Sequence, residues 1–451
     1  MAETTIKRMS KLTGVVTVPG DKSISHRAAL LSLLCTAPLE VNNYAEGDDC
    51  ARSLDAVRAL GGTVEQEGNR VRLTPPVGGL KTSSETIDCG NSGTTLRLLT
   101  GLLAGAGISA RLTGDASLRR RPMQRIVEPL RRMNATISAA PEGTPPLVTG
   151  PGEIIPIDYI LPVASAQVKS ALLLAGLASG VQVIVREKIV TRDHTERLLQ
   201  HLGCACTTEE VTPETIVDPD DPRRKKKIRA TDEYRTSVTL PARQMLVGGT
   251  VDVPGDFSTA ANFIAAGLLI RGSHIILKGV GLNSTRTAFV TILKQMGAEI
   301  AIKNRTIVCG EPVGDIEVTY GPLKPRKISG DSIPAIIDEI PLLAVIASQN
   351  EGTTIIRDAE ELRYKESDRI AAVVRNLKAM GVKIGEFPDG FAIEGGAELN
   401  GAEIDSFGDH RIAMAFTVAG AAAHGKTVIS GSEAVTVSCP RFFTMVEGFR
   451  S

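Results

Sequence analysis

Short apolar runs recur along the chain, and each follows a polar segment that often contains glycine. The runs are rich in Ala and Leu, are apolar nearly all round and begin roughly 70–90 residues apart. A helix with no polar face is typically buried inside a domain. We therefore predict six buried helices, which include residues 29–34, 96–105, 171–178, 262–269, 341–348 and 414–423.

A second, amphipathic segment follows each of the first five runs. Each segment continues through Leu or Met, then Gly or Asn, into a β-type run, the order expected where a helix ends in a C-cap and a strand follows. Charges on one face place these second helices at a surface. The segments cover residues 57–64, 130–137, 199–206, 293–300 and 377–384, and the sixth unit stops after its second helix, near the carboxyl end.

A longer repeat divides the chain into halves, because VPGDKSISHRAALLSLL (18–34) resembles VPGDFSTAANFIAAGLL (253–269). Three units lie in each half, so we predict an α/β protein of two similar domains, each made of three βαβαββ-type units, with buried helices and sheets outside. The predicted domains are residues 21–247, and 1–20 plus 248–451. The first strand joins the C-terminal domain because the sixth unit lacks its last strands. The Pro-Gly pairs at 19–20 and 254–255 are natural crossing points, since Pro fixes φ and Gly permits sharp redirection.

Composition narrows the function classes. The chain has 451 residues, with 51 Lys+Arg against 51 Asp+Glu, so no global charge attracts nucleic acid or a membrane surface. Seven scattered cysteines without a C-x-x-C pattern indicate reduced thiols rather than disulfides or zinc. The amino terminus lacks the apolar core of a signal peptide, and no apolar stretch reaches the ~18–20 residues of a membrane span. We expect a cytoplasmic protein with a small-molecule ligand, and a monomer.

Polar residues collect where the predicted helices begin. Lys22, Ser23 and Arg27 open the first, residues 91–94 the second, and residues 165–167 the third. A helix N-terminus carries unpaired N–H groups and partial positive charge, which suits an anion. The alternative for Ser23, Asn91 or Ser165 is ordinary N-capping. If equivalent helices run parallel, their N-termini converge, and two such faces would form a polyanion-binding cavity in the cleft between the domains.

Cationic clusters support an anionic ligand. Lys365 and Arg369 are four residues apart, an unfavourable like-charge pair on a helix unless an anion lies between them, and Glu366 beside them could exchange protons. Asp338 and the Asp409-His410-Arg411 triplet accompany the fifth and sixth helices. Of the arginines in LRRRPMQR (118–125), we expect Arg121 to enter the cleft.

The remaining polar residues give weaker evidence about function. The spacing indicates no metal site and no Gly-rich phosphate loop ending in Lys-Ser/Thr. We expect His26 to pack or cap rather than catalyse, and Glu196 to lie at the surface, while Arg192 could reach a phosphate. These patterns indicate an anionic small-molecule ligand but do not identify the reaction.

Eight motifs in order across nearly the whole chain resemble the 5-enolpyruvylshikimate-3-phosphate (EPSP) synthase family, most closely its divergent bacterial class. The motifs are PGDKSISHR, CGNSGTTLRL, GDASLRRRP, ASAQVKSALLLAGL, RDHTE, IDEIPLLA, RYKESDR and GDHRIAMAF. The resemblance implies two inside-out α/β barrel domains that close over the substrates. It implies transfer of enolpyruvate from phosphoenolpyruvate to the 5-hydroxyl of shikimate 3-phosphate, with phosphate released, as a step of aromatic amino-acid biosynthesis, without a cofactor.

The resemblance also implies residue roles. Asp338 would take the proton of the hydroxyl, and Glu366 with Lys22 would protonate the enol methylene; the sequence does not separate the last two as the main acid. The residues implied for shikimate 3-phosphate are Lys22, Ser23, Arg27, Ser165, Ala166, Gln167, Arg192, Asp338 and Lys365. Those implied for phosphoenolpyruvate are Lys22, Asn91, Gly93, Arg121, Gln167, Arg369 and Arg411.

Three positions depart from patterns within the family. Many relatives have Ser where this chain has Ala166, which would remove one phosphate contact, and many carry a phosphoenolpyruvate-contacting Lys where it has Val437. Gly93 occurs where glyphosate-insensitive members of the divergent class have Ala, so the open Gly predicts sensitivity to glyphosate.

Three alternative functions differ in testable ways. The sister enzyme acting on UDP-N-acetylglucosamine typically has Lys-Asn in its first motif and a reactive Cys or Asp on a mobile loop, whereas here Ser23 follows Lys22 and the corresponding loop has no Cys. A non-enzymatic sensor of phosphorylated metabolites would not need Lys22, Asp338 and Glu366 together as a proton-transfer set. An RNA-end-processing enzyme of related fold is disfavoured by the neutral charge balance and the scarcity of aromatic side chains.

Overall fold

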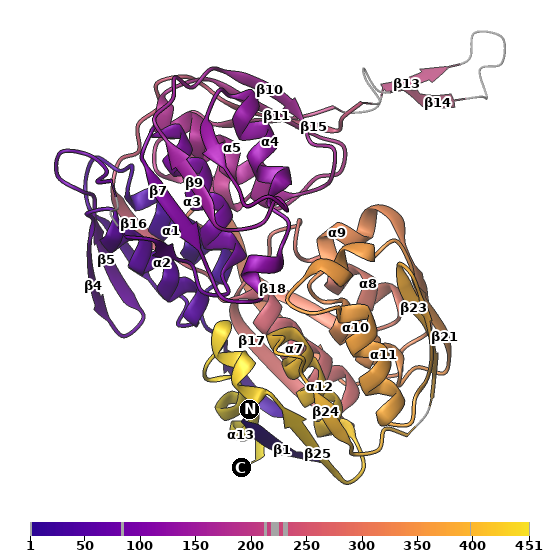
Figure 1. The fold of residues 1–451 in the computed structure, drawn as a ribbon. Helices are drawn as coiled ribbons and strands as arrows, with labels where there is room; N and C mark the ends of the chain where they lie inside the picture. Colours follow the sequence, from indigo (N-terminus) through magenta and orange to yellow (C-terminus); the bar gives the residue numbers. More distant parts are fainter. Residues whose placement is uncertain are drawn as a thin grey trace.

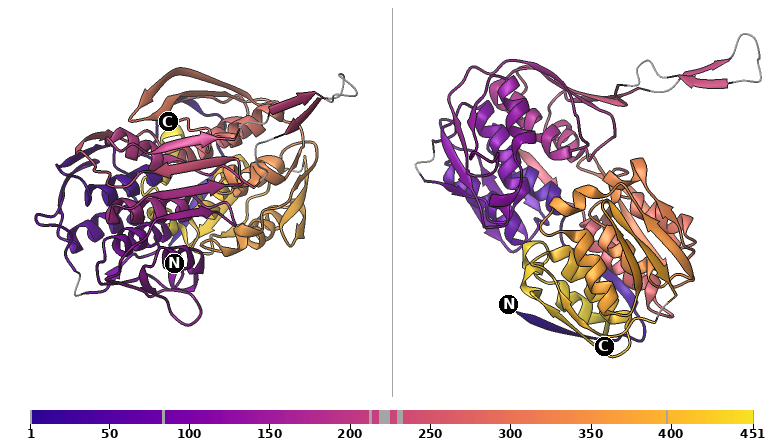
Figure 2. Two further views of the ribbon diagram at one scale, coloured as in Figure 1. Left: turned by 90° about the horizontal axis from the view of Figure 1, so that it is seen from above. Right: turned by 45° about the vertical axis from the view of Figure 1, so that its right-hand side comes forward.

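The computed structural model has two lobes, one formed by the N-terminal half and one by the C-terminal half (Figure 1). It describes residues 2–82, 85–211, 214–217, 225–228, 233–396 and 398–450. One hydrophobic core is built from residues between Ile24 and Val253. The other combines residues of the amino terminus, from Ile6 to Val18, with residues between Phe257 and Val446. Both chain ends therefore lie at the C-terminal lobe (Figure 2).

Each of the six apolar runs lies in a helix whose side chains are mostly buried. In each lobe these helices pack on one another, α3 against α5 in one lobe and α12 against both α7 and α10 in the other. They are α1 (Lys22–Ser32), α3 (Gly93–Gly105), α5 (Ala166–Ser179), α7 (Phe257–Leu269), α10 (Ile340–Ala347) and α12 (His410–Ala422).

The amphipathic segments form a second set of helices, and their predicted C-caps are confirmed. The helices are α2 (Asp48–Ala59), α4 (Gln124–Arg132), α6 (His194–His201), α8 (Ala288–Gln295), α11 (Arg369–Ala379) and α13 (Phe442–Glu447), with α9 (Ile333–Ile336) before α10. The second residue beyond the end of each of α2, α4, α6, α8 and α11 has a positive φ, which Gly and Asn tolerate best. These residues are Gly61, Asn134, Gly203, Gly297 and Gly381. Short 3₁₀ helices cover Leu118–Arg120, Gly330–Ser332, Glu360–Tyr364, Ser432–Val437 and Gly448–Arg450.

Three four-stranded sheets of the N-terminal lobe share one topology: an outer strand runs parallel to its neighbour and the remaining pairs are antiparallel. In order across each sheet, the first contains β16 (Gly249–Asp252), β3 (Leu39–Asn42), β5 (Arg70–Thr74) and β4 (Thr63–Glu67). The second contains β6 (Ile87–Asp88), β7 (Ala110–Thr113), β9 (Leu147–Gly150) and β8 (Thr136–Ser138). The third contains β10 (Ile157–Ile160), β11 (Val183–Glu187), β15 (Thr236–Leu240) and β12 (Thr207–Glu210).

The C-terminal lobe repeats this topology and takes two strands from the amino terminus. Its first sheet contains β2 (Thr13–Thr17), β17 (His274–Gly281), β19 (Glu311–Thr319) and β18 (Glu299–Val308). The second contains β20 (Lys327–Ile328), β21 (Gly352–Ile356), β23 (Gly390–Gly395) and β22 (Lys383–Phe387). The third contains β24 (Glu403–Asp405), β25 (Lys426–Ser430) and β1 (Glu3–Lys7). A separate hairpin pairs β13 (Glu214–Val217) with β14 (Lys225–Ile228).

The chain crosses between the lobes twice, at the two Pro-Gly pairs. The crossings lie side by side: Asp21 N donates to Pro254 O and Asp256 N donates to Pro19 O, both at 2.8 Å. A Cβ at Gly20 would lie 1.7 Å from the Asn43 carbonyl oxygen, so this crossing requires glycine. β2 comes from the start of the chain and pairs with β17 in the C-terminal lobe, whereas β16 comes just before the second crossing and pairs with β3 in the N-terminal lobe. Each lobe therefore contains a strand that lies next to a crossing. Residues 249–252 therefore lie in a sheet of the N-terminal lobe, beyond the boundary predicted at residue 247.

The close packing of α3 on α5 depends on glycine at the contact. Where α3 meets α5, a Cβ at Gly101 or Gly105 would lie 2.2 Å from the carbonyl oxygen of Ala171 or Ala175. The two backbones therefore touch, and the N-termini of the two helices are held side by side. The structure is thus an α/β fold with mixed sheets, and the sheets formed by the described residues are open.

Replacing Gly101 by Ala tests this packing. Ala is the better helix former by about 1 kcal/mol, but the clash with the α5 backbone opposes this gain. We expect Gly101→Ala to destabilise the protein by about 1–3 kcal/mol, as overpacked cores do. Urea unfolding followed by far-UV circular dichroism measures the change.

Gly385→Ala provides the control, because a Cβ there has no neighbour within 4 Å. Equal midpoints for Gly101→Ala and the parent protein would contradict backbone contact between α3 and α5.

Candidate active site

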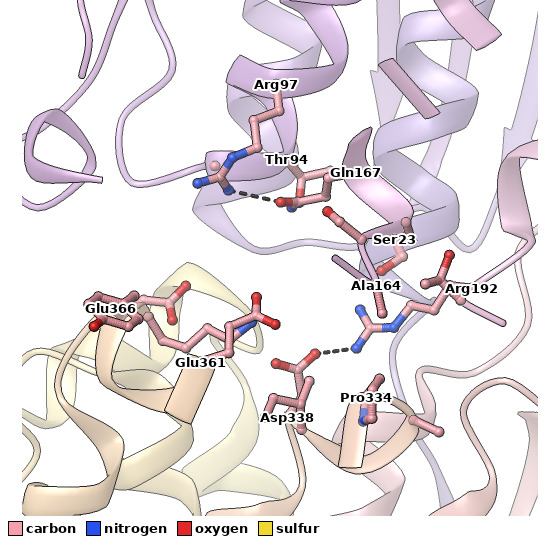
Figure 3. A pocket seen from close by; sticks show the side chains of 18 of the residues that line it. Ser23, Thr94, Arg97, Ala164, Gln167, Arg192, Pro334, Asp338, Glu361 and Glu366 are labelled. Atoms are coloured by element: carbon pink, nitrogen blue, oxygen red, sulfur yellow. Dashed lines mark hydrogen bonds and ion pairs between the residues drawn. The ribbon is translucent and has the colours of Figure 1, made fainter. Parts of the chain in front are cut away.

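A solvent-open cavity lies between the lobes and is lined by both of them. Figure 3 shows side chains of the N-terminal lobe, among them Thr94 and Gln167, facing Asp338 and Glu366 of the C-terminal lobe. The N-terminal side includes the first turns of α1, α3 and α5, together with Asp49, Arg121, Arg125 and residues 190–192. The opposite side is formed by residues just before α10 and α11 and by the first turn of α12.

Most of the predicted site residues line this cavity. They are Lys22, Ser23, Gly93, Arg121, Ser165, Ala166, Gln167, Arg192, Asp338, Lys365, Glu366, Arg369 and Arg411. Two predicted residues, Arg27 and Asn91, are not part of the lining.

The capping alternative holds for one of the three residues considered. Ser165 Oγ accepts a hydrogen bond from Val168 N at 3.4 Å and so caps α5. Ser23 and Asn91 do not cap, because Asp21 caps α1 and Ser92 caps α3. The Ser23 side chain is therefore not occupied as an N-cap and lines the cavity.

Lys22 is held by an acidic partner that the sequence analysis did not identify. Its Nζ lies 2.5 Å from Asp49 Oδ2, at the start of α2. Burial acts to lower the pKa of Lys22, but the ion pair with Asp49 outweighs it and leaves the pKa above its ordinary value. Lys22 is therefore an ammonium group at neutral pH.

Asp338 lies among cations from both lobes. Arg192 of the N-terminal lobe donates to Asp338 Oδ2, and Nη1 of Arg369 and Nη2 of Arg411 lie 3.4 and 3.5 Å from its two oxygens. Burial acts to raise the pKa of Asp338, but Arg411, Arg192 and Lys365 outweigh it and hold the pKa well below its ordinary value. The carboxyl group is ionised.

Glu366 occupies a similar setting and shares Arg369 with Asp338. Arg369 donates to Glu366 Oε2 at 2.6 Å, and Nη1 of Arg121, from the N-terminal lobe, lies 3.4 Å from Oε1. These arginines outweigh the effect of burial, so the pKa of Glu366 also lies well below its ordinary value. Arg369 is itself anchored, since its Nε donates to Asp409 Oδ2 at 2.8 Å.

The two predicted residues outside the lining lie directly behind it. Arg27 is buried and donates to Thr195 Oγ1, Ser170 Oγ and the Ser23 carbonyl at 2.7, 2.9 and 3.0 Å. Burial lowers the pKa of Arg27 to about 10. Asn91 Oδ1 accepts from Arg121 Nη2 at 2.8 Å, so Asn91 orients a guanidinium of the cavity.

Arg97 and Arg125 are further cations of the lining that the sequence analysis missed. Arg97 Nη1 donates to Gln167 Oε1 at 2.9 Å, as drawn in Figure 3. Burial, with Arg125 and Arg121 nearby, lowers the pKa of Arg97 to about 9. A cation inside the otherwise apolar run 96–105 was the available signal, because an unpaired charge is costly to bury.

Two expectations about polar residues had different outcomes. His26 is buried and its Nδ1 lies 2.8 Å from Ser53 Oγ, so it packs as expected. The prediction that Glu196 lies at the surface is wrong. Its side chain is 3% exposed and pairs with Lys169 Nζ at 2.7 Å. A lysine two positions after Gln167, on a helix without a polar face, was the signal for this pair.

Comparisons with known proteins show similarity over nearly the whole chain. The family model for EPSP synthase (3-phosphoshikimate 1-carboxyvinyltransferase) matches residues 6–231 and 225–446. The chain belongs to the EPSP synthase family. It is 42% identical over 450 residues to the 3-phosphoshikimate 1-carboxyvinyltransferase of Citrifermentans bemidjiense, which covers 99% of each chain. It is 45% identical over 441 residues to that of Herpetosiphon aurantiacus, 97% of each.

Solved structures agree with the family assignment. The EPSP synthase of Acinetobacter baumannii superposes with a TM-score of 0.81 at 37% identity, covering 99% of this chain and 98% of the other. The enolpyruvyl transferase NikO of Streptomyces tendae shares the fold, with a TM-score of 0.77 at 17% identity, covering 99% of this chain and 97% of its own.

Ala166 and Val437, which both depart from the residues of many relatives, differ in their position relative to the cavity. Ala166 lines the cavity, whereas Val437 does not. Instead, the Val437 backbone lies against α2, where a Cβ at Gly47 would come within 2.6 Å of the Val437 carbonyl oxygen.

The described residues contain neither a metal-binding cluster nor a membrane-spanning helix. No group of three or more His, Cys, Asp or Glu side chains there is arranged to hold a metal ion, and no described helix has the length and apolar character of a membrane span.

The ion pairs of Asp338 predict a pH-dependent stability. A carboxyl group whose pKa is depressed by folding stabilises the protein above its unfolded pKa, and this contribution is lost as the pH falls through the folded pKa. We expect Asp338→Asn to reduce the free energy of unfolding most above about pH 4, with the deficit shrinking at lower pH. Urea unfolding at a series of pH values measures it.

Asp55→Asn, which removes an exposed carboxylate paired with Arg58 at 2.9 Å, is the control. A deficit for Asp338→Asn that stays constant with pH would contradict the assignment of an ionised, paired Asp338.

Proposed function

We propose that this protein transfers the enolpyruvyl group of phosphoenolpyruvate to the 5-hydroxyl of shikimate 3-phosphate and releases phosphate, as an EPSP synthase of the shikimate pathway. One observation carries the proposal beyond family membership. Asp338 and Glu366 are two ionised carboxylates on one lobe, and each is paired with an arginine of the other lobe. A cavity with this excess of cations suits two anionic substrates, and the two carboxylates suit proton transfer.

Shikimate 3-phosphate would bind mainly on the N-terminal side. The first turn of α5, with Ser165 and the backbone of Ala166, and the Ser23 hydroxyl would receive the phosphate, with Gln167 against the ring. Arg27 would take the ring carboxylate, since its hydrogen-bond partners in the structure are all neutral oxygens. The proposed set is Lys22, Ser23, Arg27, Ser165, Ala166, Gln167, Arg192, Asp338 and Lys365.

Phosphoenolpyruvate carries a carboxylate and a phosphate and would need cations from both lobes. Arg121 and Lys22 lie on one side of the cavity, and Arg369 and Arg411 lie on the other. Arg97 and Arg125 add charge to the N-terminal side. The proposed set is Lys22, Asn91, Gly93, Arg121, Gln167, Arg369 and Arg411.

The reaction would proceed by addition and elimination. Asp338 removes the proton of the 5-hydroxyl as its oxygen attacks C2 of phosphoenolpyruvate, while a proton is added to C3 and a tetrahedral ketal phosphate forms. The C2–O bond to phosphate then breaks, C3 loses a proton, and the enol ether and inorganic phosphate are released. Closure of the lobes would exclude water and strengthen each charge interaction.

The ion pairs of Glu366 suggest how the acid becomes protonated. Arg121 and Arg369 hold it ionised in this structure, and the same two arginines would clamp phosphoenolpyruvate. Binding an anion there would draw both arginines away from Glu366 and add negative charge beside it, so its pKa would rise. Lys22, already an ammonium group, would be the second proton donor.

The same proposal extends to the architecture. We propose that each lobe is a domain of the inside-out α/β barrel type, with three units of buried helices and outer sheets. The domains would be close to residues 21–247, and 1–20 plus 248–451, with the boundary moved past β16. We further propose a cytoplasmic monomer that takes only small-molecule substrates and no cofactor.

Phosphate release tests the function. We expect the protein to release phosphate from phosphoenolpyruvate only when shikimate 3-phosphate is present. Asp338→Ala should lower the rate at least ~10³-fold, on the scale of a lost general base. A colorimetric phosphate assay measures both, with Asp55→Ala as a surface control that should leave the rate unchanged.

Other results would point to other functions. Release that requires UDP-N-acetylglucosamine instead would indicate the sister reaction. Tight binding of both proposed substrates without any release would indicate a sensor.

Gly93 predicts inhibition by glyphosate, which carries a phosphonate and a carboxylate. A Cβ at Gly93 would lie 2.6 Å from Arg97 Nη1 and 3.2 Å from Arg121 Nη1, inside the proposed phosphoenolpyruvate site. We expect micromolar inhibition of the parent enzyme and at least a tenfold weaker effect on Gly93→Ala, about 1.4 kcal/mol or more of lost binding. Inhibition curves against phosphoenolpyruvate measure it.

Gly321→Ala, where a Cβ has no neighbour within 4 Å, should keep the parent inhibition constant. Equal inhibition of the parent and Gly93→Ala would rule out this role for Gly93.

A further inference from the structure

A buried ion triad lies behind the proposed shikimate 3-phosphate site. Lys169 Nζ of α5 lies 2.9 Å from Glu187 Oε2, at the end of β11, and 2.7 Å from Glu196 Oε1, in α6. All three side chains are at most 3% exposed. The reaction steps proposed above use none of them.

The triad joins three separate segments of the N-terminal lobe. Glu187 Oε1 accepts hydrogen bonds from both the backbone N–H and the hydroxyl of Thr191, the residue before Arg192. Within the described part of the chain, Lys169 is the only group found paired with the Glu196 carboxylate. The Lys169 ammonium therefore connects α5 to the carboxylate of α6 directly and to Thr191 through Glu187.

The neighbours of the triad hold Arg27. Ser170, next to Lys169, accepts from Arg27 Nη2 at 2.9 Å, and Thr195, next to Glu196, accepts from Arg27 Nε at 2.7 Å. The Ser170 and Thr195 hydroxyls lie 2.7 Å apart. A shift of α5 relative to α6 would therefore break the pair of acceptors that orients the Arg27 guanidinium.

The charges of this region also depend on one another. With both carboxylates ionised, the Lys169–Glu187–Glu196 triad has a formal charge of one negative unit, opposite in sign to the buried Arg27 guanidinium. Burial lowers the pKa of Arg27, and Glu196 is the strongest influence that opposes this effect. Glu196 thus supports the charge of Arg27 without contacting it, so the N–H groups of Arg27 that have no protein acceptor stay available for an incoming carboxylate.

We propose that Lys169, through Glu187 and Glu196, is a positioning residue that holds Arg27 and Arg192 in the geometry required for shikimate 3-phosphate. This inference rests on the proposed function. It assigns the triad to one substrate only, because Arg121, Arg369 and Arg411 of the proposed phosphoenolpyruvate site make no contact with it in the described structure.

Lys169→Met tests the proposal, since Met keeps much of the length of Lys and removes the charge. We expect the Kd for shikimate 3-phosphate, measured by isothermal titration calorimetry, and its KM to rise at least about tenfold, equal to about 1.4 kcal/mol. The KM for phosphoenolpyruvate, with the other substrate saturating, should stay within about twofold, as expected for a residue acting on one site. Lys278→Met is the control, because Lys278 pairs with Asp315 at 2.6 Å on the C-terminal lobe, and it should change neither constant.

A second variant keeps the test informative if Lys169→Met folds poorly. Lys169→Met combined with Glu196→Gln retains the net charge of the triad, so it should recover much of the thermal stability while the shikimate 3-phosphate Kd stays weak. Recovery of normal binding in the double variant would overturn the proposal, since charge balance alone would then suffice. An unchanged Kd in Lys169→Met, or equal losses for both substrates, would overturn it as well.

The proposed function and the triad can fail separately. If the parent protein neither binds shikimate 3-phosphate nor releases phosphate with it, the proposed function fails. If the parent binds shikimate 3-phosphate and the Lys169 variants bind it equally well, only the role of the triad fails.

Discussion

Neutralising a dense group of cations is the constraint on which the active-site architecture depends. Arginines of both lobes point into one cavity, where their mutual repulsion would open the site unless carboxylates lay among them. Asp338 and Glu366 provide this charge, and each binds an arginine across the cavity. The groups proposed for catalysis therefore also join the two lobes across the cavity, and substrate anions would compete with them for the same arginines. In the proposed reaction, this exchange would link substrate binding to the protonation of Glu366.

The helix packing makes such a cavity attainable. Buried helices converge at their N-termini only if their backbones approach closely, which Gly101 and Gly105 permit between α3 and α5. β2 pairs with β17 in the C-terminal lobe and β16 pairs with β3 in the N-terminal lobe. Each of these strands comes just before a crossing between the lobes, and Lys22, which lines the cavity, follows the first crossing. The first turns of the helices can thus face the opposite lobe without any long loop to carry them.

Much of the fold followed from local pattern. Apolar runs located the buried helices, and Gly or Asn after the second helices located left-handed C-caps, because both signals depend on a few neighbouring residues. The place of β16 was harder to anticipate: the Pro-Gly crossings were visible, but the pairing of β16 with β3 depends on a contact about 210 residues away along the chain. Glu196 was misplaced for the same reason, since its partner Lys169 is on another helix.

The sequence by itself determined the α/β class, the repeated units, the family and most residues of the cavity, because motifs and periodicity are local properties. Only the tertiary structure decided which charges meet. It paired Lys22 with Asp49, buried Arg27 behind the lining, brought Arg97 into the cavity and kept Val437 out of it. Ion pairs and burial depend on distances between segments far apart in the chain, and the packing of the helices sets those distances.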